Sequence, residues 1–145
     1  EGLMLVRCLY ASRAAAPIAD PLVNAILEQA RRNNPRYGVT GLLCYSGDVF
    51  IQVLEGGRDG VCELFNAIVR DDRHSGVRML LFEEVIARRF SDWTMGRANI
   101  ATASCTVLLK YSEMPQLDPF VGSGAATMAL VNELLESGAI SSRPR

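Results

Sequence analysis

Hydrophobic and polar positions divide the first part of the chain into extended segments and amphipathic helices. Residues 3–10 are apolar at both odd and even positions except at Arg7, a pattern typical of a central strand covered on both faces. Asp20-Pro21 then offers an N-cap followed by a proline at the first helical position. Apolar residues recur at helical spacing until Asn33-Asn34-Pro35, where we expect this helix to end.

The next two extended segments predict a β-hairpin. Residues 38–45 and 49–54 read as strands, and Ser46-Gly47-Asp48 between them is a tight-turn sequence. Gly56-Gly57 interrupts the pattern, and a second amphipathic helix runs from there to about Asp71. Residues 77–86 then predict a fourth strand and residues 90–98 a fifth.

The predicted order, β-α-β-β-α-β-β, is that of a ferredoxin-like α+β sandwich with an added strand in a five-stranded mixed sheet. Because βαβ crossovers are right-handed, both helices should lie on one face of the sheet. The spacing of the segments does not say where the fifth strand inserts. Residues 102–110 and 125–136 have helical patterns, and we expect these C-terminal helices to cover the other, equally apolar face.

Composition removes several classes of function. The 145 residues suit one domain, and a net charge of −1 without a basic stripe argues against a nucleic-acid partner. The four cysteines include no CxxC and no His/Cys pair at metal spacing, so we expect a reduced cytoplasmic protein without a metal site. Since no signal peptide is visible and no apolar run reaches the ~18 residues of a membrane helix, we expect no membrane partner.

A set of polar residues does not fit a plain apolar core. Gln52 shares a strand face with Phe50 and Leu54, and a buried amide without partners costs on the order of 1–3 kcal/mol. Each polar residue alone has an ordinary explanation, such as a core tyrosine, a helix-capping asparagine or a surface histidine. Together they would surround the cleft between the two helices with groups suited to a flat heterocycle rich in donors and acceptors. The set comprises Tyr10, Asn33, Asn34, Gln52, Asp71, Arg73 and His74, with Trp93 and Met95 on the fifth strand.

Six blocks of the sequence resemble the BLUF family, the sensors of blue light using FAD. They keep the family's order and spacing over about two-thirds of the chain, and include Gly38-Val39-Thr40-Gly41 and Phe50-Ile51-Gln52-Val53-Leu54-Glu55-Gly56. The blocks lie at residues 5–12, 32–35, 38–45, 50–56, 70–75 and 88–95. The tail, with residues 108–112 and a following helix, is similar to the short members that carry no fused effector domain.

The resemblance implies a role for each candidate residue. The family's switch tyrosine and switch glutamine match Tyr10 and Gln52, and its ring-contacting asparagine matches Asn34, with Asn33 beside it. Ser12 matches the serine two residues after the tyrosine. The remaining matches are Asp71, Arg73 and His74, along the flavin or its ribityl and phosphate end, and Trp93 and Met95, the pair that rearranges when the signal forms.

The expected protein is therefore a blue-light sensor that binds FAD non-covalently and is not an enzyme. The resemblance implies a sensor domain over residues 1–99, a C-terminal helical extension over 100–138 and a disordered tail over 139–145. It also implies a homo-oligomer that signals to a separate protein partner.

Two other functions stay open from the residues alone. One is a small ferredoxin-like enzyme, such as a monooxygenase or an acylphosphatase-type hydrolase; the other is a regulatory module that binds no flavin. Against the enzyme, the sequence shows no Ser-His-Asp set, no metal motif and no glycine-rich phosphate loop, and His74 is its only histidine.

Overall fold

A computed structural model describes residues 4–92 and 94–136. Within these residues one sheet has the strand order β4-β1-β3-β2-β5. All neighbouring strands pair antiparallel except β5, which pairs parallel with β2 at the edge of the sheet. The strands are β1 (Leu5–Ala14), β2 (Thr40–Ser46), β3 (Val49–Gly57), β4 (His74–Val85) and β5 (Gly96–Asn99).

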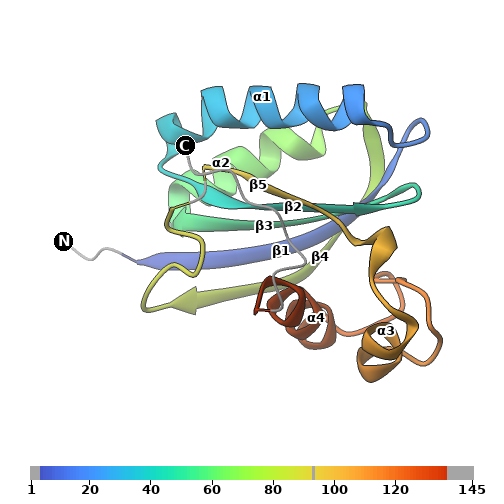
Figure 1. Ribbon diagram of the computed structural model, residues 1–145. Helices are drawn as coiled ribbons and strands as arrows, with labels where there is room; N and C mark the ends of the chain where they lie inside the picture. The colour runs from blue at the N-terminus through green and yellow to red at the C-terminus, as the bar shows by residue number, and fades with distance from the viewer. Residues whose placement is uncertain (1–3, 93, 137–145) are drawn as a thin grey trace.

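Helices cover both faces of this sheet (Figure 1). On one face lie α1 (Asp20–Tyr37) and α2 (Arg58–Val69), and on the other α3 (Cys105–Tyr111) and α4 (Gly124–Glu136). A short 3₁₀ turn, η1 (Ile100–Thr102), leads from β5 to α3. The predicted element order and the ferredoxin-like α+β class are both confirmed.

Two apolar clusters, one on each face, hold the layers together. Alternation along the strands separates them: Tyr10 and Leu54 face α1 and α2, whereas Leu9 and Ile51 face the C-terminal helices. The first turn of α4 comes close to β4, since a Cβ atom added at Gly124 would lie 2.1 Å from the Leu80 carbonyl oxygen. The C-terminal helices therefore share one apolar cluster with the sheet, although the predicted domain division at residue 99 stays a prediction.

Helix α1 differs from its predicted bounds at both ends. Ala19, not Asp20, is the N-cap, so the Asp20 carboxylate lies in the first turn. There its negative charge interacts favourably with the positive end of the helix dipole. The helix also continues through Pro35 to Tyr37. It ends at Gly38 because this residue adopts a left-handed conformation (φ 67°). The Gly38 N–H donates hydrogen bonds to the carbonyl oxygens of Asn34 and Pro35. Asn33 and Asn34 are therefore helical residues, not the end of the helix.

The fifth strand is shorter than predicted. We expected it over residues 90–98, but β5 begins at Gly96, and Met95 precedes it. The backbone N–H groups of Arg89 and Phe90 instead donate to the Glu55 carboxylate, at 2.9 and 2.7 Å. Because this side chain takes those donors, the approach to β5 is a loop and not a strand.

A further difference concerns the end of α2. Helix α2 ends at Val69, not near Asp71, so Asp71 and Arg73 lie in the following turn and His74 begins β4. The predictions for Trp93 and for the tail over 139–145 lie outside the described residues.

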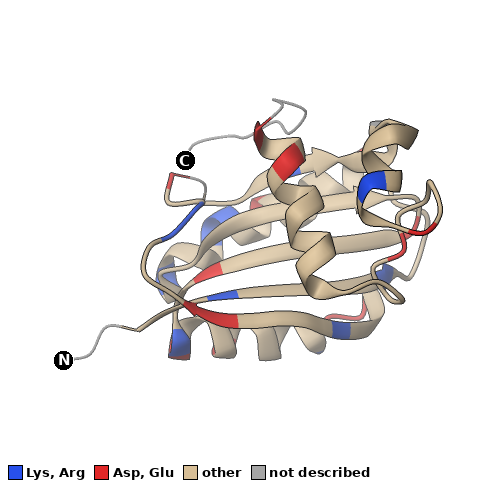
Figure 2. Cartoon of the chain, turned by 90° about the horizontal axis from the view of Figure 1, so that it is seen from below, with Lys and Arg blue, Asp and Glu red and all other residues tan. Residues whose placement is uncertain are grey.

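Charged residues of both signs are interspersed over the sheet, whereas the charged residues of α4 are acidic (Figure 2). One ordered row crosses three neighbouring strands, where Arg7 lies opposite both Glu55 and Glu83 in the strand register. Among the described residues no helix is long and apolar enough to cross a membrane. No group of His, Cys, Asp and Glu side chains in the same part of the chain is arranged to hold a metal ion.

Candidate functional site

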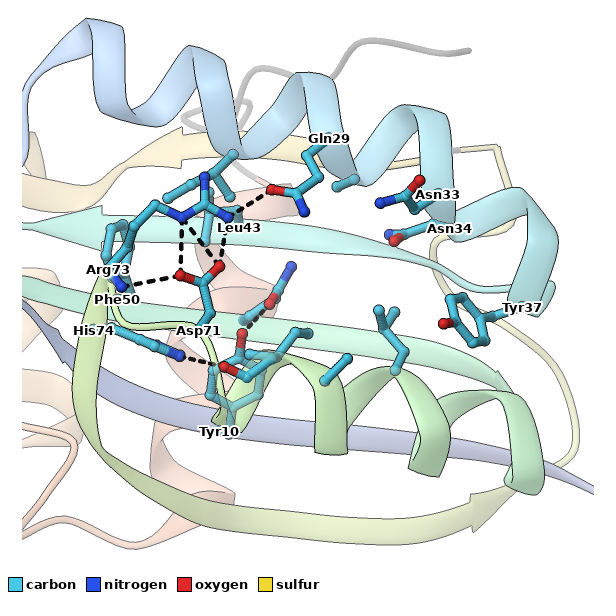
Figure 3. A pocket seen from close by; sticks show the side chains of 16 residues that line it. Tyr10, Gln29, Asn33, Asn34, Tyr37, Leu43, Phe50, Asp71, Arg73 and His74 are labelled. Atoms are coloured by element: carbon cyan, nitrogen blue, oxygen red, sulfur yellow. Dashed lines mark hydrogen bonds and ion pairs between the residues drawn. The ribbon is translucent and has the colours of Figure 1, made fainter.

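A cavity of about 160 Å³ lies between α1, α2 and the sheet. Its apolar lining comprises Ile26, Ala30, Leu43, Phe50, Leu64, Ala67 and Ile68. Its polar lining comprises Tyr10, Gln29, Asn33, Asn34, Tyr37, Gln52, Asp71, Arg73 and His74 (Figure 3). The structure thus brings together all seven residues predicted to contact the cofactor.

Tyr10 and Gln52 form the polar centre of the cavity floor. They are direct neighbours in the register of β1 and β3, and both are almost fully buried, at 3% and 5% exposure. The Tyr10 hydroxyl donates to Gln52 Oε1, and Gln52 Nε2 donates to the Met95 thioether at 3.4 Å. In this arrangement the glutamine amide connects the tyrosine to the segment just before β5.

The environment keeps the Tyr10 hydroxyl protonated. Burial raises its pKa well above the ordinary value of a tyrosine, and the nearby Cys8 thiol and Asp71 carboxylate raise it further. The phenol therefore stays protonated at neutral pH and can donate a hydrogen bond.

The two asparagines approach the cavity from α1 (Figure 3). Asn34 is 2% exposed, and among the described residues its side-chain amide makes a single hydrogen bond, from Nδ2 to the Thr94 carbonyl at 3.5 Å. A bond of this length is weak, and a buried amide can take part in up to four. Most of the capacity of Asn34 is therefore available to a molecule in the cavity.

Ser12 reaches the site through His74. Its hydroxyl lies 2.7 Å from His74 Nδ1, and His74 Nε2 lies 2.7 Å from the Ile68 carbonyl oxygen. Because a carbonyl oxygen only accepts, Nε2 carries the proton, and in the neutral ring Nδ1 accepts from Ser12. Ser12 itself is not among the residues that line the cavity, so it orients His74 in the cavity wall.

Arg73 and Asp71 lie at the end of the cavity opposite to the asparagines (Figure 3). Arg73 Nε donates to both Asp71 carboxylate oxygens at 3.0 Å, and its Nη2 donates to Gln29 Oε1 at 2.6 Å. The hydrogen bonds from Arg73 lower the pKa of Asp71, so the ion pair is maintained at neutral pH. Both side chains are partly exposed, which places a charged pair at the mouth of the cavity.

These features fit a flavin. Its ring is flat and apolar on both faces, as are the facing walls of Ile26 and Ala30 on α1 and Leu64 and Ile68 on α2. Its polar edge carries both donors and acceptors, which match the side-chain amides of Asn34 and Gln52.

The model of the BLUF family, described as sensors of blue-light using FAD, matches residues 5–96. The chain belongs to the BLUF family. Its relatives in this family include a photoactivated adenylate cyclase subunit beta of Euglena longa, 32% identical over 95 residues, which are 65% of this chain and 11% of that protein. The blue light- and temperature-regulated antirepressor BluF of Escherichia coli K12 is 33% identical over 87 residues, 60% of this chain and 22% of that protein. The matched region is thus only a small part of either relative.

Solved BLUF structures match almost the whole chain. BlsA in its photo-activated state has a TM-score of 0.81 and 31% identity, over 91% of this chain and 95% of BlsA. BlrB, a BLUF protein in its dark state, has a TM-score of 0.72 and 32% identity, over 94% of this chain and 98% of BlrB. BLUF proteins are flavin-dependent light sensors, which argues against both the enzyme and the module that binds no flavin.

Sequence reasoning missed several residues that shape this BLUF site. Gln29 and Tyr37 line the cavity, and Arg31 donates to the Met95 carbonyl. The helical spacing of Gln29 with Asn33, and of Asn33 with Tyr37, places these three on one face of α1 and could have identified two of them. Nothing in the pattern identifies Arg31, because its partner is a backbone group 64 residues away.

Proposed function

We propose that this BLUF chain is a blue-light sensor that binds FAD non-covalently in the cavity between α1 and α2 and signals by rearranging hydrogen bonds around Gln52. One observation carries the proposal: a continuous hydrogen-bonded chain runs from Tyr10 through Gln52 to Met95 along the floor of that cavity.

The cofactor would be held by groups on three sides. Asn33 and Asn34 would bond its ring edge, the apolar residues of α1 and α2 would pack on the ring faces, and Arg73 and His74 would face its side chain. The family description names FAD, whereas one related structure is of Klebsiella pneumoniae BlrP1 with FMN. We propose FAD for this chain.

A bound flavin supplies absorption of blue light and, once excited, the capacity to accept an electron. Tyr10 is the proposed donor on the protein side. Its hydroxyl already donates to Gln52 Oε1, so oxidation of the phenol ring would release the proton along this hydrogen bond. Return of the electron and the proton would restore the tyrosine, leaving no net redox change.

Gln52 is the proposed switch. While Tyr10 is briefly without its proton, the amide rotates or tautomerises. A rotation would exchange the Nε2 donor that faces Met95 with the Oε1 acceptor that faces Tyr10. A hydrogen bond contributes about 1 kcal/mol net, so exchanging two or three of them shifts a two-state equilibrium by roughly one to two powers of ten. The segment before β5 would respond first, since Gln52 Nε2 contacts Met95 there.

The output would be binding, not turnover. We propose that β5 and the C-terminal helices carry the signal to a homo-oligomer interface and to a separate cytoplasmic protein partner. Relatives such as the photoactivated adenylate cyclase subunits suggest that partners of this kind include regulated enzymes.

The test is absorbance spectroscopy of the purified yellow protein before and after blue light. The wild type should show a red-shifted flavin band that returns in the dark. Tyr10→Phe and Gln52→Leu should retain flavin and show no red-shifted state, since each keeps the side-chain volume and removes only the polar group. Tyr45→Phe is the matched control, because its hydroxyl bonds Arg97 and the residue does not line the cavity.

A wild type without flavin, or without a reversible shift, would refute the proposed function. A normal shift in Tyr10→Phe or Gln52→Leu would refute the switch assignment even with the flavin in place.

A further inference from the structure

The Met95 backbone is held by a side chain that does not line the cavity. Arg31, on α1, donates from Nη2 and Nε to the Met95 carbonyl oxygen, at 2.9 and 3.3 Å. Because two donors of one planar guanidinium bind the same oxygen, they restrict both the direction of the Met95 carbonyl and its distance from Arg31. The Met95 side chain is completely buried and receives the Gln52 amide at its sulfur. Met95 is therefore held at two points, by the proposed switch and by Arg31.

Helix α1 carries both a residue that lines the cavity and the arginine that bonds the Met95 carbonyl. Asn34 follows Arg31 by three residues and so lies beside it on the helix surface, where its amide reaches the Thr94 carbonyl. One helical turn thus binds the carbonyls of Thr94 and Met95, immediately before β5 begins at Gly96. Arg31 is half-buried and does not contact the cavity.

We propose that Arg31 is a positioning residue of the photoswitch, which holds the Met95 backbone so that a change in Gln52 moves the β5 segment between two defined positions. The inference rests on the proposed function.

The chemistry of the thioether gives the reason. The sulfur of methionine accepts hydrogen bonds and cannot donate them. When the Oε1 acceptor of Gln52 takes the place of its Nε2 donor, the Met95 sulfur therefore loses its hydrogen-bond partner. The two bonds from Arg31 are independent of the amide orientation and remain. With Arg31 present the carbonyl is retained while the side chain rearranges; without it the backbone before β5 is released as well.

The test compares four proteins: wild type, Arg31→Met, Arg31→Lys and the control Arg32→Met. Methionine keeps the length of the aliphatic stem and removes every donor, and lysine restores one donor. Arg32 is exposed on the same helix and, among the described residues, makes no hydrogen bond or ion pair. The first readout is the rate of dark recovery of the light-induced absorbance, measured at equal flavin occupancy.

We expect the recovery rate of Arg31→Met to differ from that of wild type by about three- to thirtyfold, because without the charge-assisted bonds of Arg31 the backbone before β5 is released and must be repositioned before the dark arrangement forms again. Arg31→Lys should lie between the two, and Arg32→Met should match wild type. Equal rates in Arg31→Met and wild type, or equal changes in Arg31→Met and Arg32→Met, would overturn the proposal.

The second readout needs no photochemistry. Amide hydrogen exchange of residues 96–99 in dark-adapted protein should accelerate by a similar factor in Arg31→Met and not in Arg32→Met. If the amide hydrogen exchange of Arg31→Met equals that of wild type, this result alone refutes the proposal that Arg31 fixes the Met95 backbone. A wild type that lacks the light-induced shift would instead refute the proposed function, while the exchange result would still decide the role of Arg31.

Discussion

Glu55 is a fully buried carboxylate whose removal should be one of the most destabilising changes in this protein. Its side chain has 0% exposure, and its oxygens accept from Arg7 Nε at 2.7 Å and from the backbone N–H groups of Arg89 and Phe90. Glu55→Ala leaves these three donors without their acceptor. Removing one partner of a buried ion pair costs about 3–5 kcal/mol.

A second way of reasoning gives a similar magnitude. Phe90 is 1% exposed, so water cannot replace the lost acceptor of its N–H, and an unsatisfied buried donor costs about 1–3 kcal/mol. Arg7, at 16% side-chain exposure, loses its shorter ion pair and retains the longer one to Glu83, at 3.3 Å. With about 1.5–3 kcal/mol for the lost charge-assisted bond of Arg7, the two terms add to about 3–6 kcal/mol, a large part of the 5–15 kcal/mol that stabilises an ordinary domain.

The assay is urea unfolding followed by circular dichroism, with three variants compared with wild type. We expect Glu55→Ala to lose about 3–5 kcal/mol, and Glu55→Gln, which keeps the shape and one acceptor oxygen, to lose about 1–3 kcal/mol. Glu83→Ala is the control, because it removes the other, 42% exposed partner of the same arginine and should cost below about 1 kcal/mol. A loss of less than about 1 kcal/mol in Glu55→Ala, or equal losses in Glu55→Ala and Glu83→Ala, would show that the buried carboxylate does not anchor this loop.

Two further changes should alter flavin binding. Asn34→Ala removes a buried amide from the cavity wall and should weaken flavin retention several-fold, as measured by flavin release during dialysis; full occupancy with an unchanged spectrum would count against this contact. Gly60→Ala would place a Cβ atom 2.3 Å from the Tyr37 carbonyl oxygen, so α2 must move away from the end of α1. We expect a loss of about 1–3 kcal/mol in stability and weaker flavin binding, whereas unchanged values for both would show that the two helices can adjust without cost.

Strand periodicity was sufficient to predict the central part of the fold. Alternation along its strand predicted that Gln52 faces the interior, and Tyr10 lies in a strand that was predicted to be covered on both faces. The two residues are neighbours in the β1–β3 register. The hairpin around Gly47 was predicted for a similarly local reason, since this residue has a positive φ of 61° and glycine adopts that conformation without strain. Features that depend on local backbone chemistry were therefore accessible from the sequence.

Features that depend on distant partners were not accessible, and the local signal for the end of α1 was misread. The end of α1 was placed at Pro35 because proline disfavours the helical conformation of the residue before it, yet the left-handed Gly38 decides where the helix stops. The start of β5 was placed six residues too early, because residues 90–95 alternate like a strand while the Glu55 carboxylate takes their first backbone donors. Arg31 and Glu55 read as ordinary charged residues until the fold brings backbone groups to them.

The position of β5 at the border of the sheet has a consequence for repeated illumination. Among the residues that the structure describes, β5 is four residues long and pairs with β2 alone, whereas β1 and β3 are paired on both sides. A strand with one neighbour can detach or change register while every other ladder stays intact, at the free-energy cost of a local opening. In the proposed function, a light cycle that displaces only β5 would be completed and reversed without passing through a globally unfolded species. A single molecule could then report many successive exposures without the risk of aggregation that full unfolding would bring.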